Sequence, residues 1–361
     1  MTAAHLQPRL RIVASGDYMH LRADDTIEEM GFSSFLAEPR VALDFLPAAP
    51  QSDAIPDDAL TGADALLMLG QYLRAPTIAA AASTLVAAGR AGAGTDKMDV
   101  EACTRHGVVV FNVPDALTEA TAAGALALLL AAARNLAPLD QLTRAGRWDD
   151  RSQYRGREIY RKTLGIIGPG RIGGELIRLM APFAMRVLAY SPRLTPARAA
   201  AKGAEAVPLA ALMAESDYVV VCCPLTAETE GMLGAAEIAR MQPTAILVNV
   251  GRGPVIDQAA LVRALEEKRI AGAALDVFTV QPLPKDDPLT KLDNALLCPH
   301  FVCNNFDLRG SVPAEVLRGF LRLLEGQLPD NIVNPEVLDV TAFRTKHAAL
   351  AGRFSPSARP P

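Results

Sequence analysis

Short apolar runs alternate with longer amphipathic stretches along most of this chain. Apolar runs of strand length stand at residues 10–14, 63–69, 108–112, 164–167, 187–190, 218–222, 245–250, 273–277 and 295–297. The stretches between them have helical spacing, among them 77–88 and 118–134. Strands that alternate with helices predict parallel sheets covered on both faces, so we expect an α/β fold.

Membrane and export segments are not expected. The longest apolar run, 122–133, ends at Arg134 and is shorter than the roughly 20 residues that span a bilayer, so it predicts a buried helix. The first residues lack the basic-then-apolar order of a signal peptide. The last ten residues, 352–361, contain few apolar side chains, and we expect them to be disordered.

Residues 163–193 carry a glycine pattern typical of a dinucleotide site. An apolar run leads into Gly168, Gly170 and Gly173, and an amphipathic helix and a second apolar run follow. In this pattern the first glycine makes the turn, the second lets backbone approach a pyrophosphate, and the third lets the helix pack closely. The helix N-terminus adds N–H groups and a positive dipole end. We expect a bound dinucleotide; the alternative is a glycine-rich turn that binds nothing.

Composition narrows the class of protein. The 361 residues suffice for two domains, and 50% of them are hydrophobic. A net charge of −4, with both signs mixed, argues against nucleic acid or an anionic membrane as partner. The five cysteines are scattered without a CxxC pair, which favours a reduced, cytoplasmic protein. No acidic–histidine cluster has metal-ligand spacing, so we predict no metal.

Three polar residues mark the ends of predicted strands in the second half of the chain. Arg252, Asp276 and His300 each stand at or just past the end of an apolar run. In a doubly wound sheet the carboxyl ends of the strands face the ligand crevice. We therefore expect the three side chains to converge on a nicotinamide ring.

The chain resembles the D-isomer-specific 2-hydroxyacid dehydrogenases, a family that includes glyoxylate/hydroxypyruvate reductases and formate dehydrogenases. The resemblance covers about residues 63–335. Its motifs are GRAGAGTDKMD (89–99), FNVPDALTEATAAGALALLLAAAR (111–134), GPGRIG (168–173), CPLTAETEGML (223–233), VNVGRG (248–253) and LDVFTVQP (275–282). It implies a Rossmann-type, doubly wound cofactor domain over 117–315. It also implies a smaller flavodoxin-like substrate domain, over 1–116 and 316–361, and a homodimer.

The resemblance also assigns roles to residues. Arg252 would bind the substrate carboxylate and carbonyl oxygen, for which the planar guanidinium is suited. His300 would be the acid/base that gives a proton to the ketone oxygen, because histidine titrates near neutrality. Backbone N–H groups of Ala93 and Gly94 would hold the substrate carboxylate, with Tyr72 lining the pocket.

Each of these residues also has a plainer interpretation. Arg252 could be a surface turn residue, and His300 a hydrogen-bonded histidine at a strand end. Asp276, which the resemblance places at the nicotinamide carboxamide, could cap the following turn. Tyr72 could be a packing residue with no part in the chemistry.

The cofactor residues follow from the same motifs. They lie in the glycine turn, at the ends of later strands or in the loops beyond: Gly168, Gly170, Arg171, Ile172, Gly173, Ser191, Arg193, Pro224, Thr229, Val250 and Asp276. An acid about 20 positions past the glycines normally binds the adenine ribose of NAD. Here 186–195 contains no acid, and Ser191 and Arg193 suit the 2′-phosphate of NADP. We therefore expect NADP to be preferred; the alternative is that Arg193 stacks on adenine and NAD is accepted too.

One residue departs from the hydroxyacid branch of the family. Gln281 stands where most of these members carry a glutamate that pairs with the histidine. A glutamine orients the ring but brings no negative charge, so it stabilises the charged histidine less. Formate dehydrogenases use glutamine there, and the segment QPLPKDDPL (281–289) is similar to theirs. A formate-like anion dehydrogenase is therefore an alternative function.

Two features oppose the formate alternative. The formate branch carries a substrate-binding asparagine before the long helix, and the matching segment 115–121 has none. Both branches have a small turn after the histidine, whereas this chain has FVCNN at 301–305. We expect Phe301 and Val302 to make the pocket more apolar.

Together these features predict an NAD(P)-dependent D-2-hydroxyacid dehydrogenase that acts as a 2-oxoacid reductase on a small molecule. Arg252, Gln281 and His300 would be its catalytic residues. A third alternative is a corepressor-like protein that binds NAD(H) without rapid turnover. The presence of both Arg252 and His300 favours the enzyme.

Overall fold

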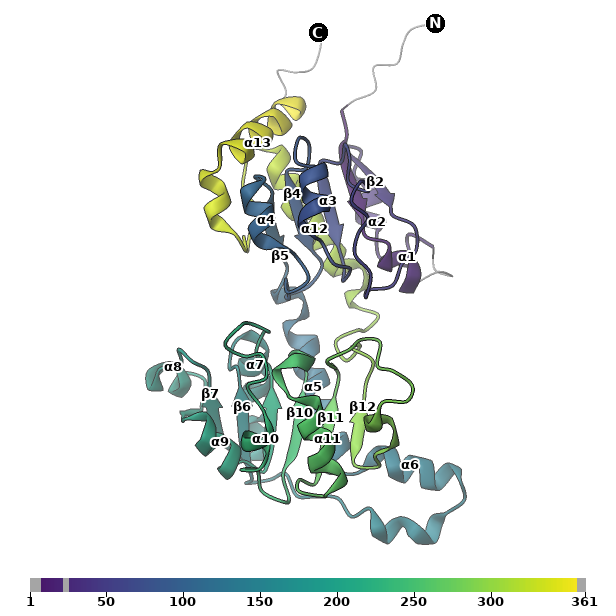
Figure 1. Ribbon diagram of the computed structural model, residues 1–361, viewed down its shortest axis with the longest axis vertical. Helices are drawn as coiled ribbons and strands as arrows, with labels where there is room; N and C mark the ends of the chain where they lie inside the picture. The colour runs from purple at the N-terminus through teal and green to yellow at the C-terminus, as the bar shows by residue number, and fades with distance from the viewer. Residues whose placement is uncertain (1–7, 22–25, 356–361) are drawn as a thin grey trace, which may run out of the picture. The chain divides into compact units, whose positions relative to one another are not determined.

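Two compact units make up the chain. The computed structural model describes residues 8–21 and 26–355. The first unit comprises Met1–Leu117 and Asn305–Pro361, and the second comprises Thr118–Asn304 (Figure 1). Each is built on one parallel sheet with helices on both faces, which confirms the predicted α/β class.

The first unit contains a five-stranded sheet in the order β2-β1-β3-β4-β5. Its strands, all in parallel ladders, are β1 (Leu10–Ala14), β2 (Val41–Phe45), β3 (Ala65–Met68), β4 (Ala87–Arg90) and β5 (Val109–Asn112). This is the flavodoxin-like order. The apolar pattern does not predict β2, because this edge strand is only partly buried and contains Asp44.

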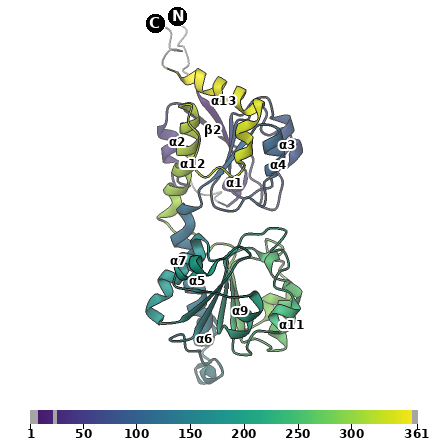
Figure 2. The ribbon, with the colours of Figure 1, turned by 90° about the vertical axis from the view of Figure 1, so that its left-hand side faces the viewer.

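Helices cover both faces of this sheet. On one face the core includes α1 (Asp17–Leu21), α2 (Ser33–Ala37), α12 (Leu308–Leu324) and α13 (Thr341–Phe354). On the other it includes α3 (Ala75–Ala80) and α4 (Val100–Arg105), which lie across the sheet from α2 and α12 (Figure 2). Strand side chains alternate between the two cores, so Leu67 packs in the first and Leu66 in the second.

The helix predicted over 77–88 is too long. It ends at Ala80, and residues 87–90 form β4 between β3 and β5. A Cβ on Gly89 would come within 2.6 Å of the Val316 side chain of α12, so this helix packs very closely on the strand. Tertiary packing therefore overrides the helical propensity of the alanines here.

α12 also determines where the chain crosses between the units. The crossing predicted after residue 315 lies at 304/305 instead, and the earlier one lies at 117/118. Val316 and Phe320 of α12 are buried in the core of the first sheet. A boundary at 315/316 would divide this helix, so all of α12 belongs to the first unit.

The second unit contains a seven-stranded sheet in the order β12-β11-β10-β9-β6-β7-β8. Its strands are β6 (Thr163–Ile167), β7 (Arg186–Tyr190), β8 (Glu205–Ala206), β9 (Tyr218–Val221), β10 (Ile246–Asn249), β11 (Gly272–Leu275) and β12 (Ala295–Leu297), all in parallel ladders. This is the doubly wound Rossmann order with one more strand at the edge. The order reverses between β6 and β9.

The helices of the second unit also divide between two faces. The core on one face includes α5 (Thr118–Ala133) and α7 (Arg171–Met180), and the other includes α9 (Leu209–Glu215), α10 (Ala235–Ile238) and α11 (Gln258–Glu266). The unit also contains α6 (Leu136–Arg144) and α8 (Pro196–Ala200). Short 3-10 helices along the chain are η1 (Asp115–Leu117), η2 (Trp148–Gln153), η3 (Ala181–Phe183), η4 (Gly253–Val255), η5 (Pro288–Lys291) and η6 (Pro335–Asp339).

In the described part of the chain, one helical stretch is long and apolar enough to cross a membrane, judged by length and composition. It spans Asp115–Ala133. Within it, Ala122, Ala125 and Leu129 of α5 are fully buried in the core of the second unit, where α5 packs beside α7. Burial against the sheet thus accounts for part of its apolar composition.

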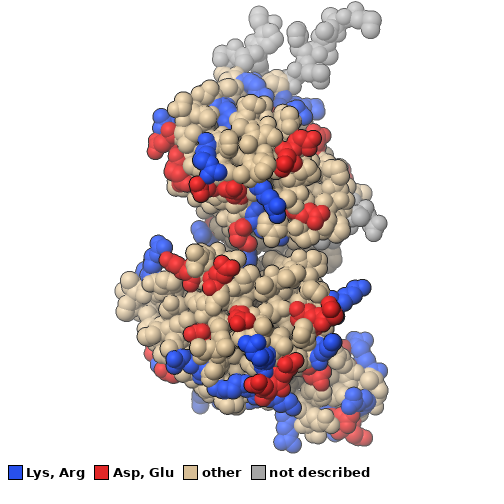
Figure 3. Space-filling model, viewed as in Figure 1, with Lys and Arg blue, Asp and Glu red and all other residues tan. Residues whose placement is uncertain are grey.

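Two predictions made from composition concern the charged surface and the last ten residues. Acidic and basic side chains are mixed over the face shown in Figure 3. Of the ten residues expected to be disordered, 352–354 are the end of α13, and 356–361 lie outside the described residues.

Asn334 joins the C-terminal segment to the edge of the first sheet. Its Nδ2 donates to the Val108 carbonyl at 3.0 Å and the Thr104 hydroxyl at 2.9 Å, while its Oδ1 accepts from the Val110 N–H at 2.8 Å. The side chain is fully buried. Asn334 therefore satisfies backbone groups that a neighbouring strand would otherwise satisfy.

We predict that Asn334→Leu lowers the free energy of unfolding of the first unit by about 2–4 kcal/mol, because at least two buried polar groups lose their partners. Urea denaturation measures the change. Gln327→Leu, at an exposed position, is the control and should change stability by less than about 0.5 kcal/mol. A loss of similar size in both variants would contradict this role.

Candidate active site

Six strands of the second sheet end side by side. The register pairs the last residues of six neighbouring strands, which are Tyr190, Ile167, Val221, Asn249, Leu275 and Leu297 in sheet order. The loops that follow therefore leave the sheet along one edge, where doubly wound sheets bind ligands. Every predicted catalytic and cofactor residue lies in one of these loops or in the first turn of α7.

The glycine turn lies where the strand order reverses. Gly168 directly follows β6 and has φ of +85°, a left-handed conformation that favours glycine. A Cβ there would come within 2.7 Å of Cys223, in the loop after β9. A Cβ on Gly173 would come within 2.5 Å of the Gly168 carbonyl oxygen. The turn and the close helix packing predicted for these two glycines are therefore present.

Gly170 has the geometry expected of a position that faces phosphate. It is the N-cap of α7, and no described heavy atom lies within 4 Å of where its Cβ would be. The next turn, which includes Arg171 and Ile172, has N–H groups with no partner inside the helix. Together with the positive end of the helix dipole, they fit the pyrophosphate of a dinucleotide. Lys202, which no sequence motif indicates, lies beside this turn, with Nζ 3.4 Å from the Gly170 carbonyl oxygen.

The loop after β7 is basic. Ser191 is half-buried and Arg193 is exposed. The first acid beyond this strand is Glu205, which is already paired with Arg186 at 3.0 Å. The same arginine pairs with Glu215 at 2.7 Å. Residues 186–195 thus contain no carboxylate that could accept from an adenine ribose, and the first one beyond them is already paired.

Thr229 shapes the loop after β9. Its buried hydroxyl accepts from the Thr226 N–H and donates to the Pro224 carbonyl, both at 2.8 Å. Pro224 itself is exposed. Direct contact of Pro224 or Thr229 with a cofactor stays a prediction.

Asn249 fixes the turn that carries Arg252. Its Oδ1 accepts from the Gly251 N–H and its Nδ2 donates to the Arg252 carbonyl, both at 3.0 Å. The asparagine is 1% exposed, and the adjoining Val250 is also buried. Arg252 Nη1 donates to the Gly251 carbonyl at 2.8 Å. The sequence analysis did not assign this role, although Asn249 stands within the VNVGRG motif.

Asp276 holds the backbone that follows His300. Its Oδ1 accepts from the N–H groups of Phe301 at 2.8 Å and Val302 at 3.2 Å. Burial raises the pKa of Asp276, and these hydrogen bonds, with one to Cys298, oppose the rise. His300 has φ of +53°, which is uncommon outside glycine, so this carboxylate stabilises a strained backbone. The contact predicted with a nicotinamide carboxamide stays a prediction.

Gln281 is the side-chain partner of His300. The distance from His300 Nδ1 to Gln281 Oε1 is 2.8 Å. With the glutamine oxygen as acceptor, Nδ1 carries a hydrogen, which directs acid/base chemistry to Nε2. Gln281 Nε2 donates to the Phe278 carbonyl at 3.4 Å. The pair thus orients the imidazole through a neutral partner, as the sequence predicts.

Tyr72, in the first unit, lies close to two cations. Lys97 Nζ is 5.0 Å and Arg74 Cζ is 5.7 Å from the centroid of its ring. These are cation–π distances, and the residue is 36% exposed. The contacts fit the packing interpretation, and a role toward substrate stays a prediction.

Ala93 and Gly94 follow β4 at the edge of the first sheet. The Ala93 carbonyl accepts from Asn112 Nδ2 at 2.6 Å. Within residues 8–21 and 26–355, neither backbone N–H has a hydrogen-bond partner. Two such N–H groups suit a carboxylate, although their use by substrate stays a prediction.

The two apolar residues after His300 have different surroundings. Phe301 is 54% exposed. Val302 packs against α5, where a Cβ on Gly124 would come within 2.5 Å of its Cγ2. Phe301 is therefore the better candidate for an apolar pocket wall, and Val302 is engaged in packing.

Three of the cysteines near this edge are protonated thiols. Burial raises the pKa of Cys222 to about 12 and the pKa values of Cys223 and Cys298 to about 11. A neutral thiol is a poor nucleophile and a poor metal ligand. Among the described residues, no group of three or more His, Cys, Asp or Glu side chains could hold a metal ion.

Known proteins are similar to this chain in sequence and in architecture. The family model described as D-isomer specific 2-hydroxyacid dehydrogenase, NAD binding domain, matches residues 126–301. A glyoxylate reductase of Korarchaeum cryptofilum is 40% identical over 296 residues, 81% of this chain and 89% of that protein. A D-3-phosphoglycerate dehydrogenase of Methanocaldococcus jannaschii is 39% identical over 254 residues, 70% of this chain and 48% of that protein. The chain belongs to the D-isomer specific 2-hydroxyacid dehydrogenase family.

A solved structure supports the same assignment. The NADPH-dependent glyoxylate/hydroxypyruvate reductase of Sinorhizobium meliloti, in complex with NADP and malonate, gives a TM-score of 0.77 at 26% identity. The match covers 91% of this chain and 98% of that one. The relatives indicate a dehydrogenase or reductase of small 2-hydroxy acids with a nicotinamide cofactor. The predicted family is confirmed.

We predict that Asp276→Ala loosens the backbone after His300. Hydrogen bonds from N–H groups to a carboxylate contribute about 1.5–3 kcal/mol each, so amide exchange at Phe301 and Val302 should rise roughly 10-fold or more. Hydrogen–deuterium exchange measures this directly. Asp276→Asn retains an acceptor oxygen and should show a smaller rise. Equal exchange in the wild type and Asp276→Ala would contradict the assignment.

Proposed function

We propose that this protein reduces a small 2-oxo acid, such as glyoxylate, to the 2-hydroxy acid with NADPH. The proposal rests on the arrangement of Arg252 and the His300–Gln281 pair beyond neighbouring strands of one sheet. The relatives that are named glyoxylate reductases support the substrate class.

Each side chain has a defined task in this reaction. The bound nicotinamide supplies the hydride for the carbonyl carbon. Arg252 binds the substrate carboxylate with its planar donors and polarises the carbonyl. His300 Nε2 gives the proton to the ketone oxygen, while Gln281 orients the ring through Nδ1. One hydride and one proton together convert the ketone into an alcohol.

The loop after β7 supports NADP as the preferred cofactor. Arg193 is available to neutralise a 2′-phosphate, and Ser191 can donate to it. The complex of the Sinorhizobium meliloti reductase with NADP agrees with this choice. We also propose that the enzyme works as a homodimer in the cytoplasm, as its family resemblance and reduced cysteines suggest.

The experiment that tests this function follows the absorbance of NADPH and NADH with purified protein. Its panel contains glyoxylate, hydroxypyruvate, pyruvate and bulkier 2-oxo acids. We expect turnover of the small acids, with kcat/KM roughly 10- to 100-fold higher for NADPH, because one charge-assisted contact is lost with NADH. No turnover, despite tight cofactor binding, would reject the reductase. Similar kcat/KM values for both cofactors would reject only the NADP preference.

Formate-like oxidation is the second candidate function. The neutral Gln281 beside His300 favours it, because hydride transfer from formate needs no acid/base. Formate with NADP⁺ or NAD⁺ therefore completes the panel. Turnover in this arm alone would replace the reductase assignment.

We predict that Gln281→Glu moves the alkaline fall in the reduction rate to higher pH. Reduction requires protonated His300, and a carboxylate at 2.8 Å would stabilise the imidazolium where the neutral amide does not. The shift should be roughly one pH unit in the pH profile of kcat. An unmoved profile would show that residue 281 does not set the protonation of His300.

A further inference from the structure

The loop that carries Gln281 has little internal support. Phe278 and Leu289 are buried, but most residues between them are exposed, and Val280 is 57% exposed. Gln281 bonds to its own loop only at the long distance of 3.4 Å, through the Phe278 carbonyl. The position of the Gln281 side-chain amide therefore depends on the contacts that fix the two ends of the loop.

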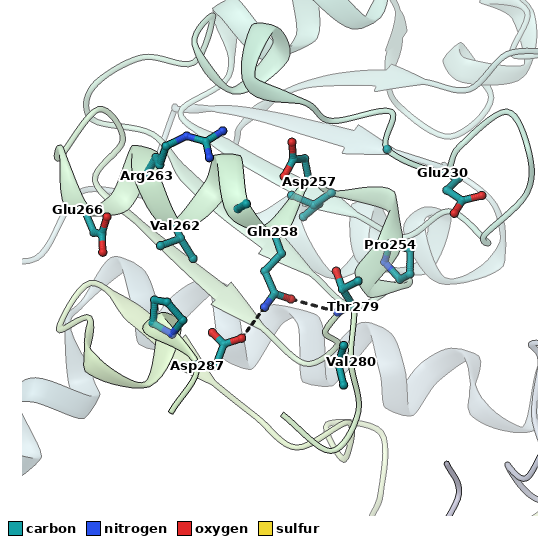
Figure 4. A pocket seen from close by; sticks show the side chains of 14 residues that line it. Glu230, Pro254, Asp257, Gln258, Val262, Arg263, Glu266, Thr279, Val280 and Asp287 are labelled. Atoms are coloured by element: carbon teal, nitrogen blue, oxygen red, sulfur yellow. Dashed lines mark hydrogen bonds between the residues drawn. The ribbon is translucent and has the colours of Figure 1, made fainter. Parts of the chain in front are cut away.

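Gln258 contacts both ends of this loop (Figure 4). Its Oε1 accepts from the Thr279 N–H at 3.0 Å, and its Nε2 donates to Asp287 Oδ2 at 2.8 Å. Thr279 stands two residues before Gln281, and Asp287 directly precedes η5. One planar amide thus joins the beginning of the loop to its end.

Both anchors of this bridge are themselves fixed. α11 begins after Asp257, whose Oδ1 accepts from the Ala260 N–H at 3.0 Å, and its buried face packs in the core of the second unit. Asp287 Oδ1 accepts from the Leu289 N–H at 2.9 Å. Gln258 therefore connects two ordered segments and leaves little freedom to the loop between them.

The same loop touches the turn that carries Arg252. A Cβ on Gly253 would collide with the backbone carbonyl of Phe278, so glycine is needed for this close approach. That carbonyl is the one to which Gln281 Nε2 donates. The arginine turn, the glutamine loop and α11 are thus in direct contact.

We infer that Gln258 is a positioning residue, which holds the loop that presents Gln281 to His300. It acts through Thr279 and Asp287 and lines a cavity of about 790 Å³ on the side of the loop that α11 faces. The inference extends the proposed reductase function, on which its catalytic consequence rests.

A reversed hydrogen bond provides the sharpest test. Gln258→Glu keeps an acceptor for Thr279 but sets a second carboxylate against Asp287. Adding Asp287→Asn restores this bond with donor and acceptor exchanged, since the asparagine Nδ2 can donate to the glutamate while its Oδ1 still accepts from Leu289. Asp287→Asn alone also breaks the bridge and serves as a second disrupting variant.

We expect each single variant to lower kcat for 2-oxo acid reduction roughly 10- to 100-fold, because a displacement of about 1 Å in a catalytic group has effects of this size. The dissociation constant of NADPH should stay within about 2-fold, since the bridge does not touch the glycine turn. The double variant should recover most of the loss. Arg263→Gln, on the same helix and lining the same cavity, is the matched control and should leave kcat unchanged. Unchanged kcat in both single variants, or an equal loss in the double variant, would overturn the inference.

A measurement without turnover separates this inference from the proposed function. The imidazole ¹⁵N–¹H spectrum reports which ring nitrogen of His300 is protonated, and His300→Asn assigns its signals among the five histidines. The wild type should show the Nδ1–H form, Gln258→Glu a mixture, and the double variant the wild-type form again. If the wild type reduced no 2-oxo acid, the proposed function would fail while these spectra still decided whether the bridge positions His300. Identical spectra in all three proteins would overturn the bridge.

Discussion

The candidate site depends on the register of the second sheet, in which the last residues of neighbouring strands are paired with one another. Because parallel strands end side by side, each loop starts from the same edge, and residues far apart in sequence become neighbours. Two buried polar side chains then determine how the loops continue. Asn249 at the end of β10 holds the Arg252 turn, and Asp276 after β11 holds the backbone beyond His300. A shift of one residue in either strand would turn these side chains toward the opposite face.

A neutral amide and backbone N–H groups are partners of two ionisable side chains at this edge. His300 meets a glutamine, and the carboxylate of Asp276 is directed to backbone N–H groups. Cys222, Cys223 and Cys298 remain protonated thiols because burial raises their pKa values.

Local sequence patterns predicted much of the fold and of the candidate site. The features that they did not predict depend mostly on long-range contacts. The glycine turn and the strand ends were predictable because their signals lie within a few consecutive residues. β4 was not predicted, and its first two residues were assigned to the helix over 77–88, since the packing against α12 comes from the far end of the chain. Asn249, Gln258 and Lys202 were not identified either. Gln258 and Lys202 contact residues 21 to 32 positions away, which no spacing rule specifies. Asn249 contacts residues only two and three positions ahead, but its role depends on the turn that the folded chain forms there.

The division of the chain into units places the predicted cofactor and catalytic residues in one unit. The glycine turn, Arg252, Gln281 and His300 all belong to one continuous segment, 118–304, whereas the first unit is assembled from two separate segments. A single recombination event that exchanged this segment would therefore carry all of these residues together. The way the chain is threaded thus lets these residues be inherited together as one block.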